Sequence, residues 1–279
     1  MTQPDPSRRE PPLPTSTDRR TGPRGHLEFF WNLIFRALRA FGVRADHFYT
    51  SVGIFLVAGA TVAVICTVAF AALGLRVRSG TTQAFDETVL RWLGAHQSKA
   101  LTYAAGELTY LGTGIVVLTV VIVAALLLWN TEHKHSARLL LAAVAGNIVL
   151  NNVLKLLFDR PRPDVFVWQT TALSSSFPSG HAMSATVCYG TVAYLAARLQ
   201  KHHWARALTL GAAALLILLI CVTRMYLGVH YPSDVIAGML VGLAWAGFCM
   251  ATLEASLVLA RRRAPSTVVE ERRAPQELA

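Results

Sequence analysis

The chain has 279 residues and a formal net charge of +10, yet only 15% of its residues are charged and its mean hydropathy is +0.43. Soluble domains carry about a quarter charged residues. This composition therefore excludes a soluble globular domain, a disordered chain, a collagen and a disulfide-rich scaffold, and it predicts an integral membrane protein. No basic face with interleaved aromatic residues is present, so we expect no nucleic-acid partner.

The N-terminal segment divides at about residue 28. Residues 1–28 hold half of the twelve prolines and few apolar side chains, which predicts a disordered tail. They lack the apolar stretch and cleavage site of a secretory signal, so we expect the first span to be an uncleaved anchor. Residues 29–43 have apolar side chains at helical spacing and are expected to lie in the membrane interface.

Six apolar runs predict six membrane-spanning helices, which places the chain in the all-α class as a six-helix membrane bundle over residues 29–260. The six runs are Ser51–Leu75, Leu108–Trp129, Leu139–Leu154, Ala182–Ala197, Ala207–Thr223 and Val235–Leu253. Between the first two, the segment Phe85–His96 is amphipathic. We expect it to pack in the outer interface, with a lid or a lipid-entry ramp as the alternative.

The basic residues near the helix ends predict the orientation of the bundle. With the N-terminus inside, eleven Lys and Arg residues lie close to the cytoplasmic ends and eight to the outer ends. Both termini are then cytoplasmic in a multi-pass protein of the cell (inner) membrane. The tail at residues 261–279 is expected to be a solvated basic segment near anionic lipid.

The cysteines do not suggest a structural role beyond packing. All four lie inside apolar runs and none forms a CxxC pair, so we expect neither a disulfide nor a zinc site. They are Cys66, Cys188, Cys221 and Cys249.

Polar residues are concentrated at four of the predicted helix ends. If six helices alternate in direction, the loop between helices three and four and the loop between five and six share the outer face. The candidate site therefore lies at the extracytoplasmic helix ends. Each residue has a structural explanation when taken alone, such as snorkelling for Lys155 or helix capping for Asp234. Together, however, these explanations would require independent coincidences at four helix ends on the same face, so we favour a functional site. The residues are Lys155, Arg162, Ser179, Gly180, His181, Arg224, His230 and Asp234.

Three of these residues are cations, which suit a phosphate group. Arginine forks match phosphate oxygens and lysine adds a point charge, so we assign phosphate binding to Lys155, Arg162 and Arg224. The pair Ser179 and Gly180 stands at the start of a helix, where free backbone amides favour an anion. Phosphoryl transfer needs this kind of fixed positive charge.

The remaining residues divide the catalytic work. His230 and Asp234 are four residues apart, so the carboxylate can hold one ring nitrogen while the other attacks; this makes His230 the nucleophile. His181 is on another helix and can protonate the leaving oxygen as a general acid. The carboxylates Asp159, Asp164 and Asp234 are too scattered in sequence for a metal site, so we expect no metal and no cofactor.

These residues resemble the type 2 phosphatidic acid phosphatase superfamily, which also includes vanadium haloperoxidases and glucose-6-phosphatase. The match covers roughly Phe85 to Leu253. The first family motif, a lysine, six residues and Arg-Pro, matches Lys155 to Pro163, and the second, Pro-Ser-Gly-His, matches Pro178 to His181. The third matches Arg224, His230 and Asp234, with Thr223 in place of serine.

The resemblance implies a six-helix membrane bundle, an active site facing away from the cytoplasm and a phosphohistidine intermediate hydrolysed by water. Its bacterial members act on undecaprenyl diphosphate, phosphatidylglycerol phosphate or phosphatidate, and no motif distinguishes these lipids. We therefore predict a metal-independent lipid phosphate or diphosphate phosphatase whose partners are its lipid substrate and the bilayer.

Three other functions remain open. A lipid-linked phosphotransferase would use the same phosphohistidine and differ only in its acceptor. A lipid-binding or transport protein is disfavoured by the intact histidines, and a haloperoxidase is disfavoured because those relatives are soluble. Asp159 and Arg160 lie beside the first motif without an assigned role.

Overall fold

The computed structural model describes residues 49–172 and 174–263, which contain helices and no strands. The helices are α2 (Tyr49–Arg78), α3 (Gln83–Ala95), α4 (Lys99–Tyr110), α5 (Gly114–Asn130), α6 (Lys134–Phe158), α7 (Gly180–Leu199), α8 (His203–Tyr226) and α9 (Pro232–Arg263). The predicted tail at residues 1–28, the amphipathic segment 29–43 and residues 264–279 of the C-terminal tail lie outside the described residues.

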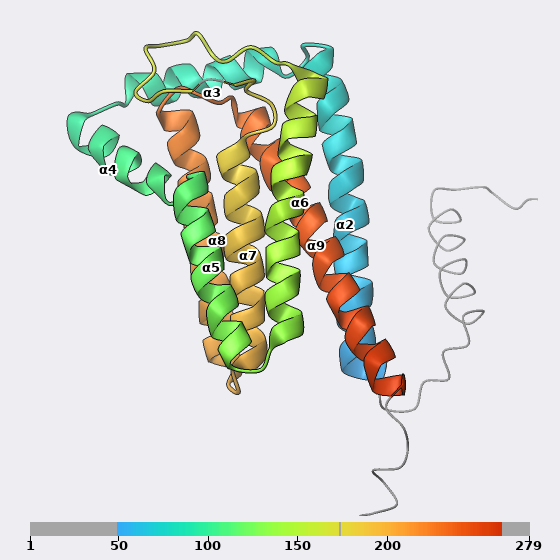
Figure 1. Cartoon of the computed structure of the whole chain (residues 1–279). Helices are drawn as coiled ribbons and strands as arrows, with labels where there is room; N and C mark the ends of the chain where they lie inside the picture. Colours follow the sequence, from blue (N-terminus) through green and yellow to red (C-terminus); the bar gives the residue numbers. More distant parts are fainter. Residues whose placement is uncertain (1–48, 173, 264–279) are drawn as a thin grey trace, which may run out of the picture. The chain divides into compact units, whose positions relative to one another are not determined.

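Six long helices, α2 and α5 to α9, run alongside one another as a bundle (Figure 1). They correspond to the six predicted spans, and the all-α membrane class is confirmed. In the described part of the chain, α2, α6, α8 and α9 are long and apolar enough to cross a membrane, and the bent pair α4 and α5 is a candidate fifth span. The prediction of six equivalent spans is therefore approximate, and α7 is the helix that departs from it.

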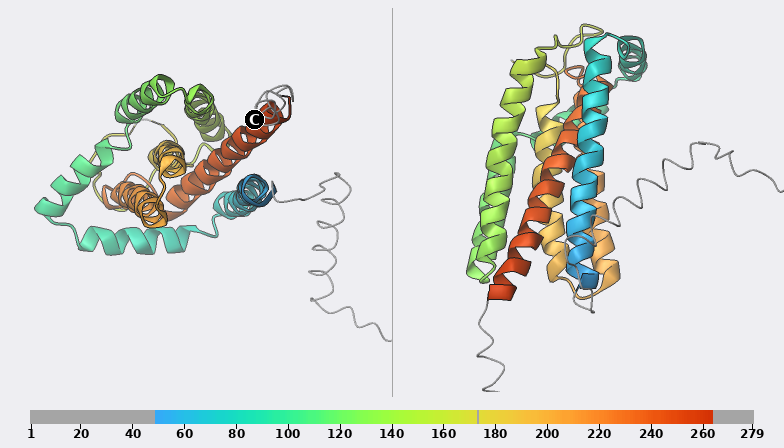
Figure 2. Two further views of the ribbon diagram at one scale, coloured as in Figure 1. Left: turned by 90° about the horizontal axis from the view of Figure 1, so that it is seen from below. Right: turned by 90° about the vertical axis from the view of Figure 1, so that its right-hand side faces the viewer.

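Helix α7 differs from the others because it lies among them (Figure 2). It packs against α5, α6, α8 and α9, and half of its residues are buried. A helix covered by protein on several sides does not need an apolar surface towards lipid. This explains why α7 carries residues such as Ser184, Thr186 and Thr191 and is less apolar than a typical span.

The second span begins later than the sequence predicted. The apolar run starts at Leu108, but α4 ends at Tyr110 and α5 starts at Gly114, and the two helices meet at an angle of 46°. Thr113 has an extended backbone at the start of α5, which interrupts the helix. The uncharged run therefore contains a turn as well as a span.

Helix α3 confirms the predicted amphipathic segment and lies across one end of the bundle (Figure 1). Its buried residues are Asp86 and Leu90, whereas Phe85 and Trp92 are each 61% exposed. Exposed aromatic side chains at a bundle end are typical of a helix in the membrane interface. The buried carboxylate on its inner face was not anticipated.

The contact between α7 and α9 is close because α9 carries glycine where the helices cross. A Cβ atom at Gly238 would lie 2.5 Å from the backbone oxygen of Ser179. Small residues allow such close approach between membrane helices. Gly238 therefore lets the first turn of α7 lie directly against the first turns of α9.

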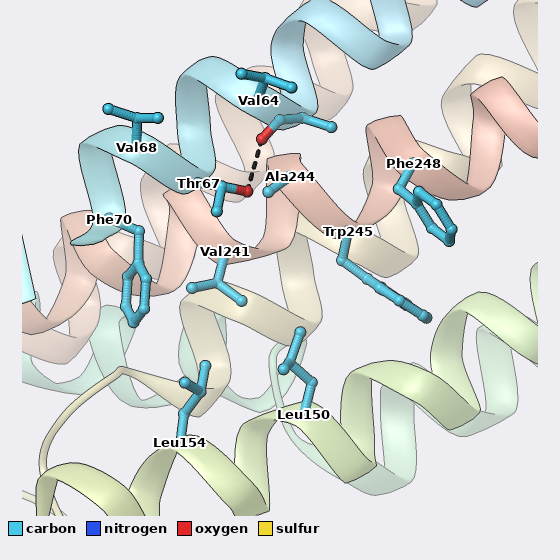
Figure 3. Close-up of a pocket in the computed structure, with 11 residues that line it drawn as sticks. Val64, Thr67, Val68, Phe70, Leu150, Leu154, Val241, Ala244, Trp245 and Phe248 are labelled. Carbon is cyan, nitrogen blue, oxygen red and sulfur yellow. Dashed lines mark hydrogen bonds between the residues drawn. The ribbon is translucent and has the colours of Figure 1, made fainter.

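An apolar groove of about 500 Å³ lies between α2, α6 and α9 (Figure 3). Its lining includes Phe70, Leu154 and Val241, and the Thr67 hydroxyl in it donates to the Ala63 carbonyl of its own helix at 2.7 Å. The indole N–H of Trp245 is likewise bonded to the Ala143 carbonyl. These two polar groups are satisfied within the protein, so the lining suits hydrocarbon.

Candidate active site

Four helix ends meet at the end of the bundle that α3 crosses (Figure 1). There α6 and α8 end, and α7 and α9 begin. The Ser179 N–H donates to the Asp234 carbonyl at 2.9 Å, which joins α7 to α9. Arg162 Nη1 donates to the Val229 carbonyl at 2.7 Å, which joins the loop after α6 to the α8–α9 turn. The structure therefore brings the predicted motif segments together.

The end of α6 is defined by a residue that the sequence analysis left without a role. Asp159 has a left-handed backbone with φ of 40°, and its N–H donates to the Lys155 carbonyl. Aspartate tolerates this conformation better than most residues. Pro161 then disfavours further helix for the residue before it. Lys155 thus stays in the last turn of α6 while the chain turns back over the bundle.

Three cations surround one end of the site. Lys155 Nζ donates to Ser174 Oγ at 2.7 Å, and Arg162 Nε donates to the Ser174 carbonyl at 2.7 Å. Arg224 is only 4% exposed, and its Nη1 donates to Thr109 Oγ1 at 2.8 Å. The charges of Lys155, Arg162 and Arg224 act on one another, and burial lowers the pKa of Arg162 from its usual range. A compact group of like charges favours an anionic ligand.

Two buried polar groups among the predicted phosphate-binding residues have no hydrogen-bond partner within the described residues. They are the hydroxyl of Ser179, which is fully buried, and Nε of Arg224. Buried polar groups are nearly always paired, so each such exception calls for an explanation. Ser179 precedes the first turn of α7, where backbone amides lack partners inside the helix. These groups are suited to oxygens of a bound anion.

His230 lies beside this group with its two ring nitrogens in different surroundings. Nδ1 donates to the Ser176 carbonyl at 2.8 Å, so that nitrogen carries the proton. Nε2 lies 3.5 Å from Arg162 Nη1. The ring is 2% exposed, and burial lowers the pKa of His230 to about 4, with Asp234 opposing the shift and Arg224 and Arg162 adding to it. At neutral pH the ring is therefore uncharged, and its unprotonated Nε2 accepts a long hydrogen bond from Arg162 Nη1.

Asp234 contacts His230 less directly than its spacing suggested. Its Oδ2 is 3.6 Å from Nδ1 of the histidine, which exceeds a hydrogen bond. The same oxygen accepts the Tyr231 N–H at 2.9 Å, an arrangement that caps the first turn of α9. The ring nitrogen that the sequence assigned to the carboxylate is thus hydrogen-bonded to the Ser176 carbonyl, with Asp234 as a second neighbour.

His181 lies in the first turn of α7 and faces the α4–α5 turn. A Cβ atom at Gly112 would lie 2.9 Å from His181 Cδ2, so glycine at this turn leaves room for the ring. His181 lies within electrostatic reach of His230, Arg224, Lys155 and Arg162. The two histidines of the predicted pair therefore belong to one site.

Sequence reasoning missed three further residues of the site. Ser176 contributes a backbone carbonyl, which no side-chain pattern reveals. Arg160 and the buried Asp86 form an ion pair at 2.9 Å, and Arg160 also pairs with Asp234 at 2.6 Å. One signal was available, because Asp86 is a carboxylate in the first turn of a mostly apolar amphipathic segment.

The described residues include no group of three or more His, Cys, Asp or Glu side chains arranged to hold a metal ion. All four cysteines are buried free thiols.

The sequence matches a family model described as the PAP2 superfamily over residues 136–257. The matched segment contains every predicted site residue from Lys155 to Asp234 and leaves α3 outside it. The family assignment inferred from the three motifs is thereby confirmed.

Two relatives and a solved structure are similar to the chain. Phosphatidylglycerophosphatase B of Bacillus subtilis is 28% identical over 62% of this chain and 86% of its own length. An undecaprenyl-diphosphatase of Sulfolobus acidocaldarius is 34% identical over 48% of this chain and 63% of its own. A crystal structure of a transmembrane PAP2-type phosphatidylglycerolphosphate phosphatase from Bacillus subtilis superposes with a TM-score of 0.65 at 25% identity, over 73% of this chain and 98% of its own. The chain is similar to the PAP2 superfamily over residues 136–257 and is a membrane lipid phosphatase of the PAP2 type.

Proposed function

We propose that the protein hydrolyses the phosphomonoester or diphosphate of a membrane lipid through a phosphohistidine on His230. The observation that carries the proposal is the position of the unprotonated Nε2 of His230, 3.5 Å from Arg162 Nη1, in a site whose Ser179 and Arg224 donors are unpaired within the described residues. A nucleophile thus faces a site suited to phosphate. Undecaprenyl diphosphate, phosphatidylglycerol phosphate and phosphatidate are the substrates we propose.

The first half of the reaction transfers phosphate to the enzyme. Lys155, Arg162, Arg224 and the amides at the start of α7 hold the phosphate oxygens and stabilise the charge that spreads over them in the transition state. His230 Nε2 attacks phosphorus, and the bond from phosphorus to the leaving-group oxygen breaks. Bound phosphate offsets the charges of the nearby cations, so that His181 enters this step protonated. It donates that proton to the leaving oxygen, and the alcohol or the lipid monophosphate leaves in a protonated form.

The second half returns the enzyme to its starting state. His181, now neutral, takes a proton from a water molecule, whose oxygen attacks phosphorus. The phosphorus–nitrogen bond breaks, its electron pair returns to Nε2, and inorganic phosphate is released. Throughout, the Ser176 carbonyl holds the proton on Nδ1, so that Nε2 remains the attacking atom.

We further propose that the site faces the extracytoplasmic side of the inner membrane, with both chain termini in the cytoplasm. The support is the excess of Lys and Arg at the opposite helix ends. Labelling of single cysteines introduced at Lys99 and Lys201 in intact cells, with a reagent that does not cross the membrane, tests this orientation. Only the cysteine at position 99 should react, and reaction at position 201 alone would reverse the proposed topology.

The function is tested by phosphate release in detergent with excess EDTA from undecaprenyl diphosphate, phosphatidylglycerol phosphate, phosphatidate and lysophosphatidate. We expect release from at least one lipid by the wild type, and a loss of about 10³-fold or more in His230→Ala because the nucleophile is gone. The matched control is His96→Ala, which removes the exposed histidine that follows α3 and should keep wild-type activity.

Brief reaction with a substrate labelled in its phosphate should also leave acid-labile, base-stable label on the wild type and none on His230→Ala. Near-normal turnover by His230→Ala would remove the proposed nucleophile. Folded wild-type protein that releases no phosphate from any of these lipids would instead favour the transferase, in which an acceptor hydroxyl replaces water.

A further inference from the structure

Arg160 is buried at the centre of a charged cluster beneath α3. Its side chain is 9% exposed, and its two terminal nitrogens pair with different carboxylates. Nη2 lies 2.9 Å from Asp86 Oδ2, and Nη1 lies 2.6 Å from Asp234 Oδ1 and 2.8 Å from Ser233 Oγ. The guanidinium group also stands over the Tyr231 ring at 4.2 Å. One side chain thus joins α3 to the first turn of α9.

Asp86 forms the second half of this connection. The residue is fully buried, and its Oδ1 accepts the Ser233 N–H at 3.0 Å while its Oδ2 accepts the Ser233 hydroxyl at 2.5 Å. Asp86 therefore supplies an acceptor to a free amide at the start of α9 and a counter-charge to Arg160. The amphipathic helix α3 is held against the active site by these contacts.

The cluster also determines what surrounds Nδ1 of His230. Two oxygens face this nitrogen, the Ser176 carbonyl at 2.8 Å and Asp234 Oδ2 at 3.6 Å. Arg160 holds both of them. Its side chain binds the other oxygen of Asp234, and its backbone carbonyl accepts the Ser176 N–H at 2.9 Å. A displacement of Arg160 would therefore move both groups that keep the proton on Nδ1.

The buried charges of Asp86, Arg160 and Asp234 compensate one another, so each of the three residues is needed. Asp86 and Asp234 are fully buried, and a buried charge without a partner is costly. Arg160 lies between them and pairs with each. Without Asp86, Arg160 would keep only its ion pair with Asp234 and could shift towards it. Without Arg160, the two buried carboxylates would lose their shared counter-charge. Either change alters the field and the geometry at His230.

We propose that Arg160 and Asp86 are positioning residues, which together keep His230 in the tautomer that presents Nε2 to phosphorus. The proposal rests on the function proposed above for His230. It gives α3, which lies outside the segment matched by the family model, a direct part in organising the nucleophile.

The test compares Asp86→Asn, Arg160→Gln and Arg160→Lys with the wild type. In the first two we expect kcat to fall about 10- to 100-fold, because a small displacement of a reacting group has effects of this size. KM and the inhibition constant of inorganic phosphate should change less than about threefold, since Lys155, Arg162 and Arg224 are untouched. Arg160→Lys should recover part of kcat, because lysine keeps the charge but cannot reach both carboxylates with a fork.

The matched control is Arg91→Gln. Arg91 lies on α3, as Asp86 does, and pairs with Glu87, but its side chain is 65% exposed. This variant should keep wild-type kcat and KM. A loss of activity there would show that any charge change on α3 impairs the enzyme and would overturn the specific role of Asp86.

A second measurement does not depend on turnover. In ¹⁵N-histidine-labelled protein, the nitrogen shifts of His230 report its tautomer. We expect the Nδ1–H form in the wild type and in Arg91→Gln, and a mixture of tautomers in Asp86→Asn and Arg160→Gln. If the wild type releases no phosphate, the proposed function fails, but this measurement still decides whether Arg160 and Asp86 position the ring.

The proposal is overturned if the variants keep wild-type kcat, or if their tautomer is unchanged while kcat and phosphate affinity fall together. The latter result would show that the cluster only holds α3 against the bundle and has a purely structural role. Folding is checked by size-exclusion chromatography and thermal unfolding. If Asp86→Asn or Arg160→Gln does not fold, the kcat, KM and tautomer of Arg160→Lys are compared with those of the wild type instead.

Discussion

The two sides of the His230 ring differ in how completely their polar groups are paired. On the Nδ1 side, Asp86, Arg160 and Asp234 pair their charges with one another and with backbone or hydroxyl groups. Nε2 lies 3.5 Å from Arg162 Nη1, and among the proposed phosphate-binding residues the Ser179 hydroxyl and Arg224 Nε have no partner within the described residues. A saturated network fixes geometry, whereas unpaired donors are available to a ligand. The fold thus supports the ring from its Nδ1 side, and the unpaired donors are where we expect phosphate to bind.

The largest change in activity is expected for Arg224→Gln, which tests the proposed phosphate side of this comparison. Removing a buried cation from the phosphate side should lower kcat/KM about 10²- to 10³-fold, because the transition-state charge loses one of its fixed partners. Steady-state phosphate release measures the change. The control is Arg78→Gln, at the exposed end of α2, which should leave kcat/KM unchanged. A loss below about threefold in Arg224→Gln would place Arg224 outside the phosphate site.

Two buried serines allow a more direct comparison. Ser179→Ala should lower kcat/KM about tenfold without lowering the melting temperature, because its hydroxyl has no partner within the described residues. Ser233→Ala should lower the melting temperature, because its hydroxyl bonds both Arg160 and Asp86, and such bonds contribute about 1–3 kcal/mol each. Thermal unfolding in detergent and phosphate release are measured on both variants. Equal loss of stability in the two variants would contradict the claim that only the Ser233 side is held by paired polar groups.

The smallest effect concerns the pH dependence of stability. The pKa of folded His230 is about 4, below the usual value of about 6.5 for an unfolded chain. As pH falls from about 6.5 to 4, the unfolded state therefore binds a proton that the folded state does not, and the unfolding free energy decreases. The melting temperature of His230→Gln should fall less steeply than that of the wild type over this range. His96→Gln, which changes an exposed histidine, should keep the wild-type slope, and identical slopes in all three proteins would contradict the shifted pKa.

The sequence was informative where a local pattern carries the structure. Uncharged apolar runs identified the long helices, because membrane spans must be apolar over about 20 residues. The same rule misjudged α7, which is covered by other helices, and the start of the second span, where a turn at Gly112 interrupts an uncharged run. Motif spacing predicted that Lys155, Arg162, His181, Arg224 and His230 lie close together, since alternating helices bring their ends to one face, and the structure places them at one end of the bundle.

The chain by itself determined which residues stand at the helix ends and therefore which chemistry the site can perform. Only the tertiary structure decided how those residues are held. The partner of His230 Nδ1 is a carbonyl 54 residues away, Arg160 reaches Asp234 across 74 residues, and Asp86 meets Ser233 across 147. Contacts of this kind leave no periodic trace in a sequence, because they depend on how helices cross and on which backbone groups the crossing leaves free.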